Sequence, residues 1–396
     1  MAGLFRRCFC LLVSLLPAVA SAVPCAGEIH DLMQKHAYLQ ELKDGRFTEA
    51  GIASMDAEEF QAALQEADIY ASYTTPDRVS RLVSLRKAGV AGVGMDIIRD
   101  REKQVRCLPN QGSPAAEAGI EHGNTLLAVD GFPVDSLTLD EIAQFVRGAP
   151  GTDVTLTVEN TAGYVEEFVV TRAAGDYPDV TLTLGTPGTP RIMRPGPRTS
   201  ALLNRVTGNR KETGTSAGSS SRSSPDVLRI TRFGPKTAAQ LAEVLAKLSR
   251  EPQTEKRRLV LDLRGNTGGV LEQAALCTAM FLADDAVIYR YRSRAGIRDV
   301  LVPHGSQKLS RRFLIRQDEF TASSAEMMIN ALRHGADASS FGSRSGGKAR
   351  VQNVFPLSDG SYLKFTVGEL QYLDTEGSWQ GTGLKPDVET GPRRDR

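Results

Sequence analysis

A stretch spanning residues 186–225 limits the fold of this 396-residue chain more than any other feature. It consists mainly of Pro, Gly, Ser, Thr and Arg, and it carries few large apolar side chains. Such a segment cannot bury enough apolar surface to offset the entropy lost on ordering. We therefore expect a mobile linker between separately folded parts. The basic side chains also allow a second interpretation, contact with anionic lipid or cell-wall polymer, although composition favours the plain linker.

Two kinds of pattern precede this linker. Residues 23–87 place apolar side chains three and four apart, which predicts a small helical segment. Residues 88–175 alternate short β-type runs with turn signals, which predicts a β-rich domain. The expected strands are 105–108, 125–129, 154–158 and 165–170, and the expected short helices are 114–118 and 138–146.

After the linker, residues 226–396 alternate strands and helices. Residues 259–263 form a continuous apolar run, as in buried parallel strands. The pattern predicts an α/β layer with crossover helices, so the whole chain is expected to be a multidomain protein of the α/β (α+β) class. The expected strands are 227–230, 259–263 and 312–315, and the expected helices are 237–248, 271–282 and 324–332.

Composition and charge narrow the function classes. The hydrophobic fraction of 41% and the charged fraction of 24% are typical of a soluble globular protein. A net charge of +1 gives no bias toward nucleic acid, which is not expected as a partner. The cysteines and histidines show no spacing typical of a metal site, and neither a metal nor another cofactor is expected.

The first 22 residues have the pattern of a secretory signal. Arg6 and Arg7 precede an apolar run from Leu11 to Ala20, and a small-residue cleavage site ends at Ala22. We therefore expect export to the periplasm or the medium, with a retained anchor as the alternative.

Cleavage there leaves three cysteines, an odd number that does not describe a disulfide framework. A single bond between Cys25 and Cys107 and buried free thiols both fit the sequence. Cys277 lies in an apolar helical pattern and is expected in the core.

A serine in the second half of the chain is the first candidate for chemistry. Ser323 and Glu326 have the spacing of a helix capping box, which is a purely structural interpretation. The same position can be functional, because N–H groups at a helix start can stabilise the oxyanion of an acyl-transfer intermediate. His334 cannot be its base, since eleven helical residues separate the two by about 16 Å.

A lysine supplies the alternative base. Lys348 follows Gly346 and Gly347, where a lysine is usually a solvated turn residue. It can accept a proton near neutral pH only if its surroundings keep the amine uncharged. Gln352, four residues later, can orient it through a hydrogen bond.

A third stretch joins a strand to a glycine turn. Asp262 and Arg264 end the apolar run, and a turn ending in Gly268 and Gly269 opens the next helix. Glycines there let backbone N–H groups approach an anion. The Lys-Ser/Thr pair of a phosphate-binding loop is missing, which favours a peptide oxyanion.

Together these stretches resemble the carboxyl-terminal processing proteases, also called tail-specific proteases. The family patterns Asp-Leu-Arg-x-Asn-x-Gly-Gly, Ser-Ala-Ser-Ala-Ser-Glu and Gly-Lys-x-x-Val-Gln align with residues 262–269, 321–326 and 347–352. This resemblance implies that 226–396 is a serine protease core. It implies the following roles: Ser323 as nucleophile, Lys348 as base, Gln352 as the residue positioning the base, and the N–H groups of Gly269 and Ser324 as oxyanion donors.

The β-rich domain has a resemblance of its own. Residues 112–124 look like the PDZ stretch of these proteases, which implies that 88–175 is a PDZ domain. The family's carboxylate-binding loop then falls on Val93, Gly94 and Met95. Such a loop holds a C-terminal carboxylate through backbone N–H groups.

Three departures from the family pattern involve four residues. Ser324 and Ala325 replace Ala and Ser, Ala349 replaces a glycine, and Asn124 replaces an Asp. The change at Ala349 matters only if that position requires a positive φ.

The resemblance implies an exported serine endopeptidase with a Ser–Lys dyad that cleaves proteins near their free C-terminus. A secreted PDZ scaffold with a non-cutting core is the main alternative, and an envelope-binding protein acting through residues 186–225 is a third. Protein or peptide substrates are the expected partners, and the sequence does not indicate the oligomeric state or the natural substrate.

Overall fold

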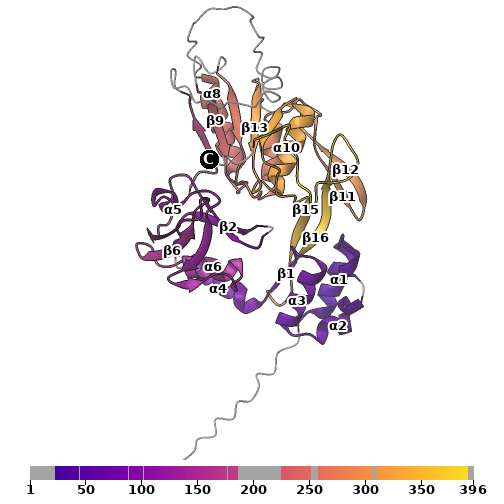
Figure 1. Cartoon of the computed structure of the whole chain (residues 1–396). Coiled ribbons are helices and arrows are strands. Elements are labelled where there is room, and N and C mark those ends of the chain that lie inside the picture. Colours follow the sequence, from indigo (N-terminus) through magenta and orange to yellow (C-terminus); the bar gives the residue numbers. More distant parts are fainter. Residues whose placement is uncertain are drawn as a thin grey trace, which may run out of the picture. The chain divides into compact units, whose positions relative to one another are not determined.

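The computed structural model describes residues 23–390 except 44, 88, 101, 176, 186–223, 251–256, 306, 307 and 310. The predicted signal, residues 1–22, lies outside the described residues, as does nearly all of the predicted linker. The described chain forms two compact units, one containing residues up to 79 together with 353–365, the other containing 80–352 and the residues from 366 onward (Figure 1).

The first unit is mainly helical. Asp56 begins one of its helices with a complete capping box to Glu59, and Phe60 of that helix packs edge-on against Phe47 and Tyr73. A short strand, which the sequence did not predict, pairs Tyr73 with Leu363. The elements are α1 (Ala26–His36), α2 (Glu49–Ala53), α3 (Ala57–Ala67) and β1 (Ser72–Thr74), with two short 3₁₀ turns at Gln40–Leu42 and Gly45–Phe47. Helix α4 (Pro76–Lys87) leads into the second unit.

The PDZ-like part of the second unit is an antiparallel sheet in the order β2-β3-β4-β6-β7, with β5 paired to β4. Its inward side chains, such as Ile142 and Leu156, are fully buried in their own core. Thr138 caps the longer helix with Glu141, which sets its start. The elements are β2 (Met95–Arg99), β3 (Val105–Pro109), α5 (Pro114–Glu117), β4 (Thr125–Val129), β5 (Phe132–Pro133), α6 (Leu139–Val146), β6 (Asp153–Glu159) and β7 (Val165–Thr171).

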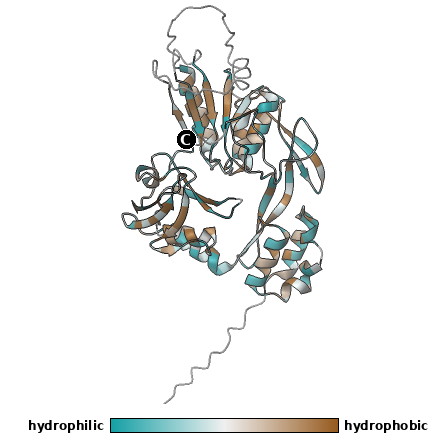
Figure 2. Cartoon of the chain, viewed as in Figure 1, coloured by the Kyte–Doolittle hydropathy of each residue, from teal (hydrophilic) through white to brown (hydrophobic). Residues whose placement is uncertain are grey.

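The rest of the second unit is built on a sheet in the order β17-β14-β13-β10-β9-β8. All neighbouring strands in it are parallel except β8, which is antiparallel to β9. Figure 2 shows the apolar character of its strands, and helix α9 packs against both α8 and α10. The elements are β8 (Val180–Thr183), β9 (Asp226–Ile230), α8 (Thr237–Arg250), β10 (Leu259–Asp262), α9 (Leu271–Ala279), β13 (Phe313–Gln317), α10 (Ser324–Gly335), β14 (Ser339–Gly342) and β17 (Val388–Glu389).

This topology brings two loops together. Strands β10 and β13 are parallel, with Asp262 opposite Arg316, so the segments that follow them leave the sheet at the same edge. Ligand sites in open α/β sheets form at such edges. The two segments are the glycine turn 265–269 and the residues that lead to Ser323.

A second sheet has the order β1-β16-β11-β12, with β15 paired to β16. Strands β15 (Arg350–Pro356) and β16 (Tyr362–Gln371) each contribute residues to both units. The sequence predicted none of this sheet, which also contains β11 (Val287–Ser293) and β12 (Gly296–Leu301). The predicted fold class is confirmed, with a helical N-terminal part, an antiparallel PDZ-like sheet and a mixed sheet in the core.

The three described cysteines are free thiols, so the alternative of a Cys25–Cys107 bond is not seen. Burial raises the pKa of both Cys107 and Cys277 to about 12, which leaves these thiols protonated and unreactive. Within the described residues, no helix has the length and apolar character needed to cross a membrane.

Candidate active site

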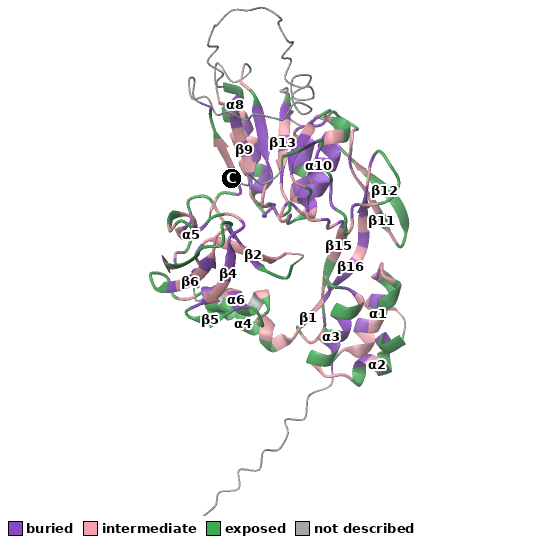
Figure 3. Cartoon of the chain, viewed as in Figure 1, coloured by how far each residue is buried: buried purple, intermediate pink, exposed green. Residues whose placement is uncertain are grey.

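Ser323 is the residue immediately before helix α10 and has an unusual backbone. Its φ of 59° and ψ of −125° lie in a region that non-glycine residues rarely occupy. Such conformations cost about 1–3 kcal/mol and persist only where the surroundings enforce them. Helix α10 supplies that support, because every residue from Ser324 to Leu332 is buried (Figure 3).

Glu326 connects this serine to the lysine segment. Its carboxylate is fully buried and accepts hydrogen bonds from four groups. The Ser323 N–H and the Lys348 N–H donate to Oε2 at 2.9 and 2.8 Å, and the Gly347 N–H and the Ser345 hydroxyl donate to Oε1 at 2.8 and 2.5 Å. Because one oxygen accepts from both backbones, the Ser323 and Lys348 nitrogens can be separated by no more than the sum of the two distances.

Glu326 therefore has two roles: it caps helix α10, as predicted, and it also binds residues 345–348. Burial raises the pKa of Glu326, and the hydrogen bonds from Ser345, Lys348, Gly347 and Ser323 oppose this rise. The sequence signal for the second role was weak, because residues 345–348 are some twenty positions away from Glu326 along the chain.

The glycine turn approaches the serine very closely. A side-chain carbon on Gly268 would lie 2.7 Å from Ser323 Cβ and 3.1 Å from the Ser324 nitrogen, so only glycine fits there. Asn266, which is fully buried, fixes the turn: its Oδ1 accepts the Gly268 N–H at 2.9 Å, and its carbonyl accepts the Ala322 N–H at 2.9 Å.

Two N–H groups at this junction are unused. Within the part of the chain that the structure describes, neither the Gly269 N–H nor the Ser324 N–H donates a hydrogen bond. They are the two donors expected for an oxyanion. Free N–H groups beside a nucleophile are the arrangement that stabilises a developing negative charge on a carbonyl oxygen.

Lys348 is half-buried and lies two residues before the start of strand β15. Its neighbour Ala349 is fully buried and is not among the residues with positive φ, so this departure from the family pattern does not strain the backbone. The N–H groups of Ala349 and Arg350 both donate to Gln380 Oε1, at 2.9 and 3.0 Å. These bonds and those to Glu326 fix the main chain on both sides of the lysine.

Gln352, the predicted positioning residue, lies in strand β15. Its side-chain amide donates to the Arg350 carbonyl at 3.1 Å and to Thr366 Oγ1 at 3.3 Å. Its role in positioning Lys348 stays a prediction. The backbone of the lysine segment is held by Glu326 and Gln380.

Asp262 ends strand β10 and is buried against two arginines. Burial alone would raise the pKa of Asp262, but its hydrogen bonds with Arg264, and the charges of Arg264 and Arg229, lower it below the usual value. The shortest contact, Arg264 Nη2 to Asp262 Oδ2, is 2.7 Å. The pair therefore stabilises the start of the glycine turn rather than offering a free anion site.

Asp318 organises the residues before the serine, and the sequence analysis did not identify it. Its Oδ1 accepts the N–H groups of Gly265 and Thr321, each at 3.0 Å. Its Oδ2 lies 3.2 Å from Nε2 of His122, which belongs to the PDZ-like part. His122 also packs edge-on against Phe320 and against the α-carbon of Gly265.

Two loop residues in the PDZ-like part leave their N–H groups unused. The carbonyls of Val93 and Gly94 accept the N–H groups of Ala115 and Asn110 at 3.0 and 2.9 Å. Their own N–H groups donate to no described residue. Gly94 has a φ of 68°, and Met95 begins strand β2. Asn124, the replaced Asp, keeps its acceptor role by taking the Glu121 N–H at 2.8 Å.

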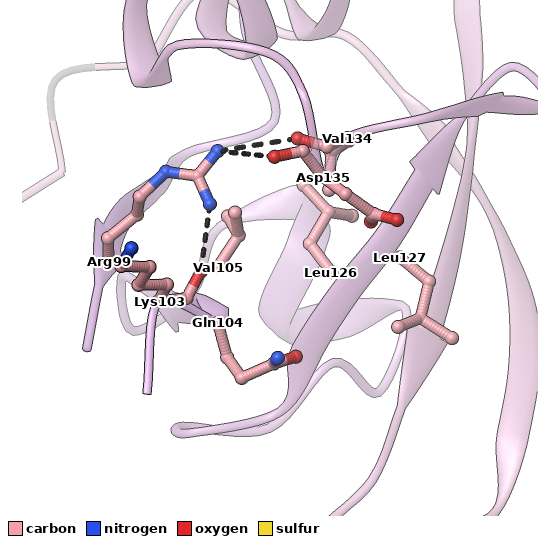
Figure 4. A pocket seen from close by; sticks show the side chains of 8 residues that line it. All are labelled: Arg99, Lys103, Gln104, Val105, Leu126, Leu127, Val134 and Asp135. Atoms are coloured by element: carbon pink, nitrogen blue, oxygen red, sulfur yellow. Dashed lines mark hydrogen bonds between the residues drawn. The ribbon is translucent and has the colours of Figure 1, made fainter. Parts of the chain in front are cut away.

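A separate pocket of about 420 Å³ lies at the other end of β2. Arg99 spans it and donates to the carbonyls of Lys103, Val134 and Asp135 (Figure 4). The Arg99 guanidinium is thereby occupied by backbone acceptors, which gives it a structural role at the end of β2. The pocket is distinct from the loop at Val93–Met95.

Comparison with known proteins agrees with this geometry. Residues 227–390 match the model of peptidase family S41, and residues 106–160 match a PDZ domain. The carboxyl-terminal-processing protease of Synechocystis is 26% identical over 79% of this chain, and the carboxy-terminal processing protease CtpA of Bacillus subtilis is 24% identical over 89%. The matches span 65% and 66% of those proteins' own lengths.

Solved structures give the same fold. The photosystem II D1 C-terminal processing protease superposes with a TM-score of 0.68 at 22% identity, covering 93% of this chain and 92% of that one. A putative S41 protease from Bacteroides fragilis gives 0.52 at 17% identity, covering 92% and 90%. Residues 227–390 therefore form a peptidase domain of family S41, and a PDZ domain precedes it in the chain.

Proposed function

We propose that this protein is an exported serine endopeptidase that cleaves polypeptides near the C-terminus after its PDZ domain has bound the terminal carboxylate. One observation carries the catalytic part: buried Glu326 holds the backbones of Ser323 and Lys348 beside two unused N–H groups. Export is proposed from the signal pattern of residues 1–22 alone.

The reaction starts at the serine hydroxyl. The Ser323 oxygen attacks the peptide carbonyl while neutral Lys348 accepts its proton, and the N–H groups of Gly269 and Ser324 bind the resulting oxyanion. Collapse breaks the C–N bond, and the lysine ammonium returns the proton to the leaving amine. Water then attacks the acyl-enzyme with Lys348 again as base, which releases the acid and regenerates the serine.

The unused N–H groups at Val93 and Gly94 support the recognition part. A carboxylate is the ligand that such donors suit, and a peptide can extend β2 at the same time. Curated relatives named for carboxyl-terminal processing also support this choice. Contact of residues 186–225 with the cell envelope stays a prediction, because nearly all of that segment lies outside the described residues.

Incubation with an unstructured polypeptide of apolar C-terminus tests the proposal. We expect cleavage near the C-terminus and a loss of at least about 10⁴-fold in kcat for Ser323→Ala and for Lys348→Ala. Ser136→Ala and Lys385→Ala, at exposed positions, are the matched controls. Undiminished cleavage by either dyad variant would reject the dyad, and binding without cleavage by the parent protein would favour the PDZ scaffold.

A further inference from the structure

The segment that follows the PDZ domain packs against the proposed carboxylate loop. A side-chain carbon on Gly94 would lie 2.5 Å from Cε2 and 2.8 Å from Cζ of Tyr177, and one on Gly175 would lie 2.6 Å from the Tyr177 hydroxyl. The phenol end of Tyr177 therefore lies between two glycine backbones, one of them in the loop whose N–H groups are unused. This contact is possible only because neither position carries a side chain.

The phenol of Tyr177 remains a hydrogen-bond donor. Burial, and to a lesser extent the nearby charge of Glu117, raises the pKa of Tyr177, so the hydroxyl stays protonated at neutral pH. A neutral phenol next to backbone N–H donors can donate to a carboxylate, whereas a phenolate would repel it.

Two residues further along, Asp179 anchors the same segment to the peptidase domain. It is buried, with 4% of its surface exposed. Arg232 Nε donates to Oδ1 at 2.6 Å, the Thr237 hydroxyl donates to Oδ2 at 2.5 Å, and the Thr231 N–H donates to the Asp179 carbonyl at 2.9 Å. Pro178, between the two residues, fixes its own φ and stiffens the connection.

The loop at residues 231–237, which binds Asp179, also binds the oxyanion segment around Gly269. Phe233 lies between Arg232 and Gly234, and a side-chain carbon on Gly234 would lie 2.7 Å from Asp179 Oδ2. The Phe233 N–H donates to the Gly268 carbonyl at 2.9 Å, and the Phe233 carbonyl accepts the Val270 N–H at 2.8 Å. Phe233 thus fixes the peptide groups on both sides of Gly269, whose N–H is a proposed oxyanion donor.

We propose that Tyr177 is part of the terminal-carboxylate site and that Asp179 is a positioning residue for the oxyanion segment, so that residues 177–179 connect the two sites. This inference rests on the proposed function. It assigns a contact with the substrate's C-terminus to Tyr177, and it assigns to Asp179 an effect on catalysis exerted through Phe233. The test measures the role of each residue separately.

The test uses the full chain and two peptides that differ only in a free C-terminal acid or a C-terminal amide. For Tyr177→Ala we expect KM for the acid peptide to rise about tenfold, since one charge-assisted contact is lost. The value of kcat for the acid peptide, and both kcat and KM for the amide peptide, should be nearly unchanged. Tyr177→Phe removes the hydroxyl and keeps the ring, so it separates the effect of the hydroxyl on KM from that of the ring. Tyr164→Ala, at an exposed tyrosine of the same domain, is the matched control and should keep the preference for the acid.

For Asp179→Asn we expect the opposite split. The value of kcat should fall about 10- to 100-fold for both peptides because Gly269 is misplaced, while the ratio of KM values for acid and amide stays as in the parent. Arg232→Gln, which removes one partner of Asp179, should lower kcat in the same direction by less. Asp374→Asn, at an exposed carboxylate of the peptidase domain, is the control, and melting temperatures report folding.

Binding of the two peptides is also measured in the Ser323→Ala background. This measurement separates a failure of terminus capture from a failure of catalysis. Unchanged preference for the acid in Tyr177→Ala would overturn the role of Tyr177. A lowered melting temperature with unchanged kcat in both Asp179→Asn and Arg232→Gln would overturn the role of Asp179. A parent protein that cleaves both peptides equally would overturn terminus capture together with this inference, and cleavage by Ser323→Ala would reject the proposed catalyst itself.

Discussion

Around the start of α10, three carboxylates hold the main chain: buried Asp262 and Glu326 and partly buried Asp318 accept backbone donors, and Asp262 also accepts from arginine. The loop at Val93 and Gly94 contains no such carboxylate and is held by its own carbonyls, with glycine and Tyr177 as neighbours. The difference fits the function that we propose for each region. Peptide cleavage requires a fixed nucleophile, base and oxyanion site, whereas a terminal carboxylate requires only N–H donors and the absence of competing negative charge.

This contrast predicts that changes near α10 lower kcat, whereas changes in the PDZ loop raise KM. The largest effect is expected at Glu326. Glu326→Ala leaves the N–H groups of Ser323, Gly347 and Lys348 without their acceptor, which should lower kcat by about 10³-fold or more and unfolding free energy by more than about 3 kcal/mol.

Glu326→Gln keeps one acceptor oxygen and should be impaired less than Glu326→Ala in both kcat and urea midpoint. Glu272→Ala, at an exposed glutamate in the first turn of α9, is the control and should be close to the parent. Equal activity of Glu326→Ala and the parent would show that Glu326 is only a helix cap.

Gly268→Ala should have the next largest effect. The added carbon would contact Ser323 Cβ at 2.7 Å, and displacing the nucleophile by about 1 Å is expected to lower kcat about 10²-fold. Gly163→Ala is the matched control, since Gly163 has a positive φ of 86° but open space around it. A steady-state assay that finds the same kcat for both variants would contradict the close approach.

Gly94→Ala tests the other side of the contrast. The added carbon would collide with Tyr177 and Ser113, which should raise KM for a free-acid peptide about tenfold and leave kcat within about twofold. Gly112→Ala shares the positive φ, at 72°, without a neighbour within 4 Å. A fall in kcat with unchanged KM would remove the distinction between the two regions.

Acid stability should show the smallest effect. Burial alone would raise the pKa of Asp318, but the hydrogen bond and charge of His122, with the Gly265 N–H and Thr321, lower it below the usual value. The resulting stabilisation is complete above the ordinary aspartate pKa of about 3.9 and is lost as the pH falls through the lower folded-state value. Asp318→Asn should therefore have a urea midpoint that depends less on pH below about pH 4. An unchanged acid dependence would show that Asp318 contributes no such linkage.

The sequence predicted the parts of the fold that have strong local patterns. Strands β4 and β10 and helices α6 and α10 carry clear periodicity, turn signals or caps, and they form close to the expected positions. The sheet containing β11, β12, β15 and β16 was missed. Its exposed strand β12 lacks an apolar alternation, and β16 pairs with β1 and β11, which lie far from it in the sequence.

The site was predictable to the extent that family motifs mark it. Motifs pointed to Ser323, Lys348, Gln352 and the glycine turn, and the catalytic roles that they imply stay predictions. The motifs could not reveal that Glu326 serves two distant segments, or that Asp318 and Asn266 fix the turn. Those roles depend on long-range contacts between buried polar groups, which leave little pattern in a single sequence.

Trapping the acyl-enzyme shows whether Ser323 is the nucleophile. An activated peptide ester is turned over, the reaction is quenched in acid, and mass spectrometry maps the acyl group. We expect an acyl group on Ser323 alone, formed far more slowly in Lys348→Ala and absent in Ser323→Ala. An acyl group on another residue, or continued peptide cleavage with no acyl group on Ser323, would contradict this role of Ser323.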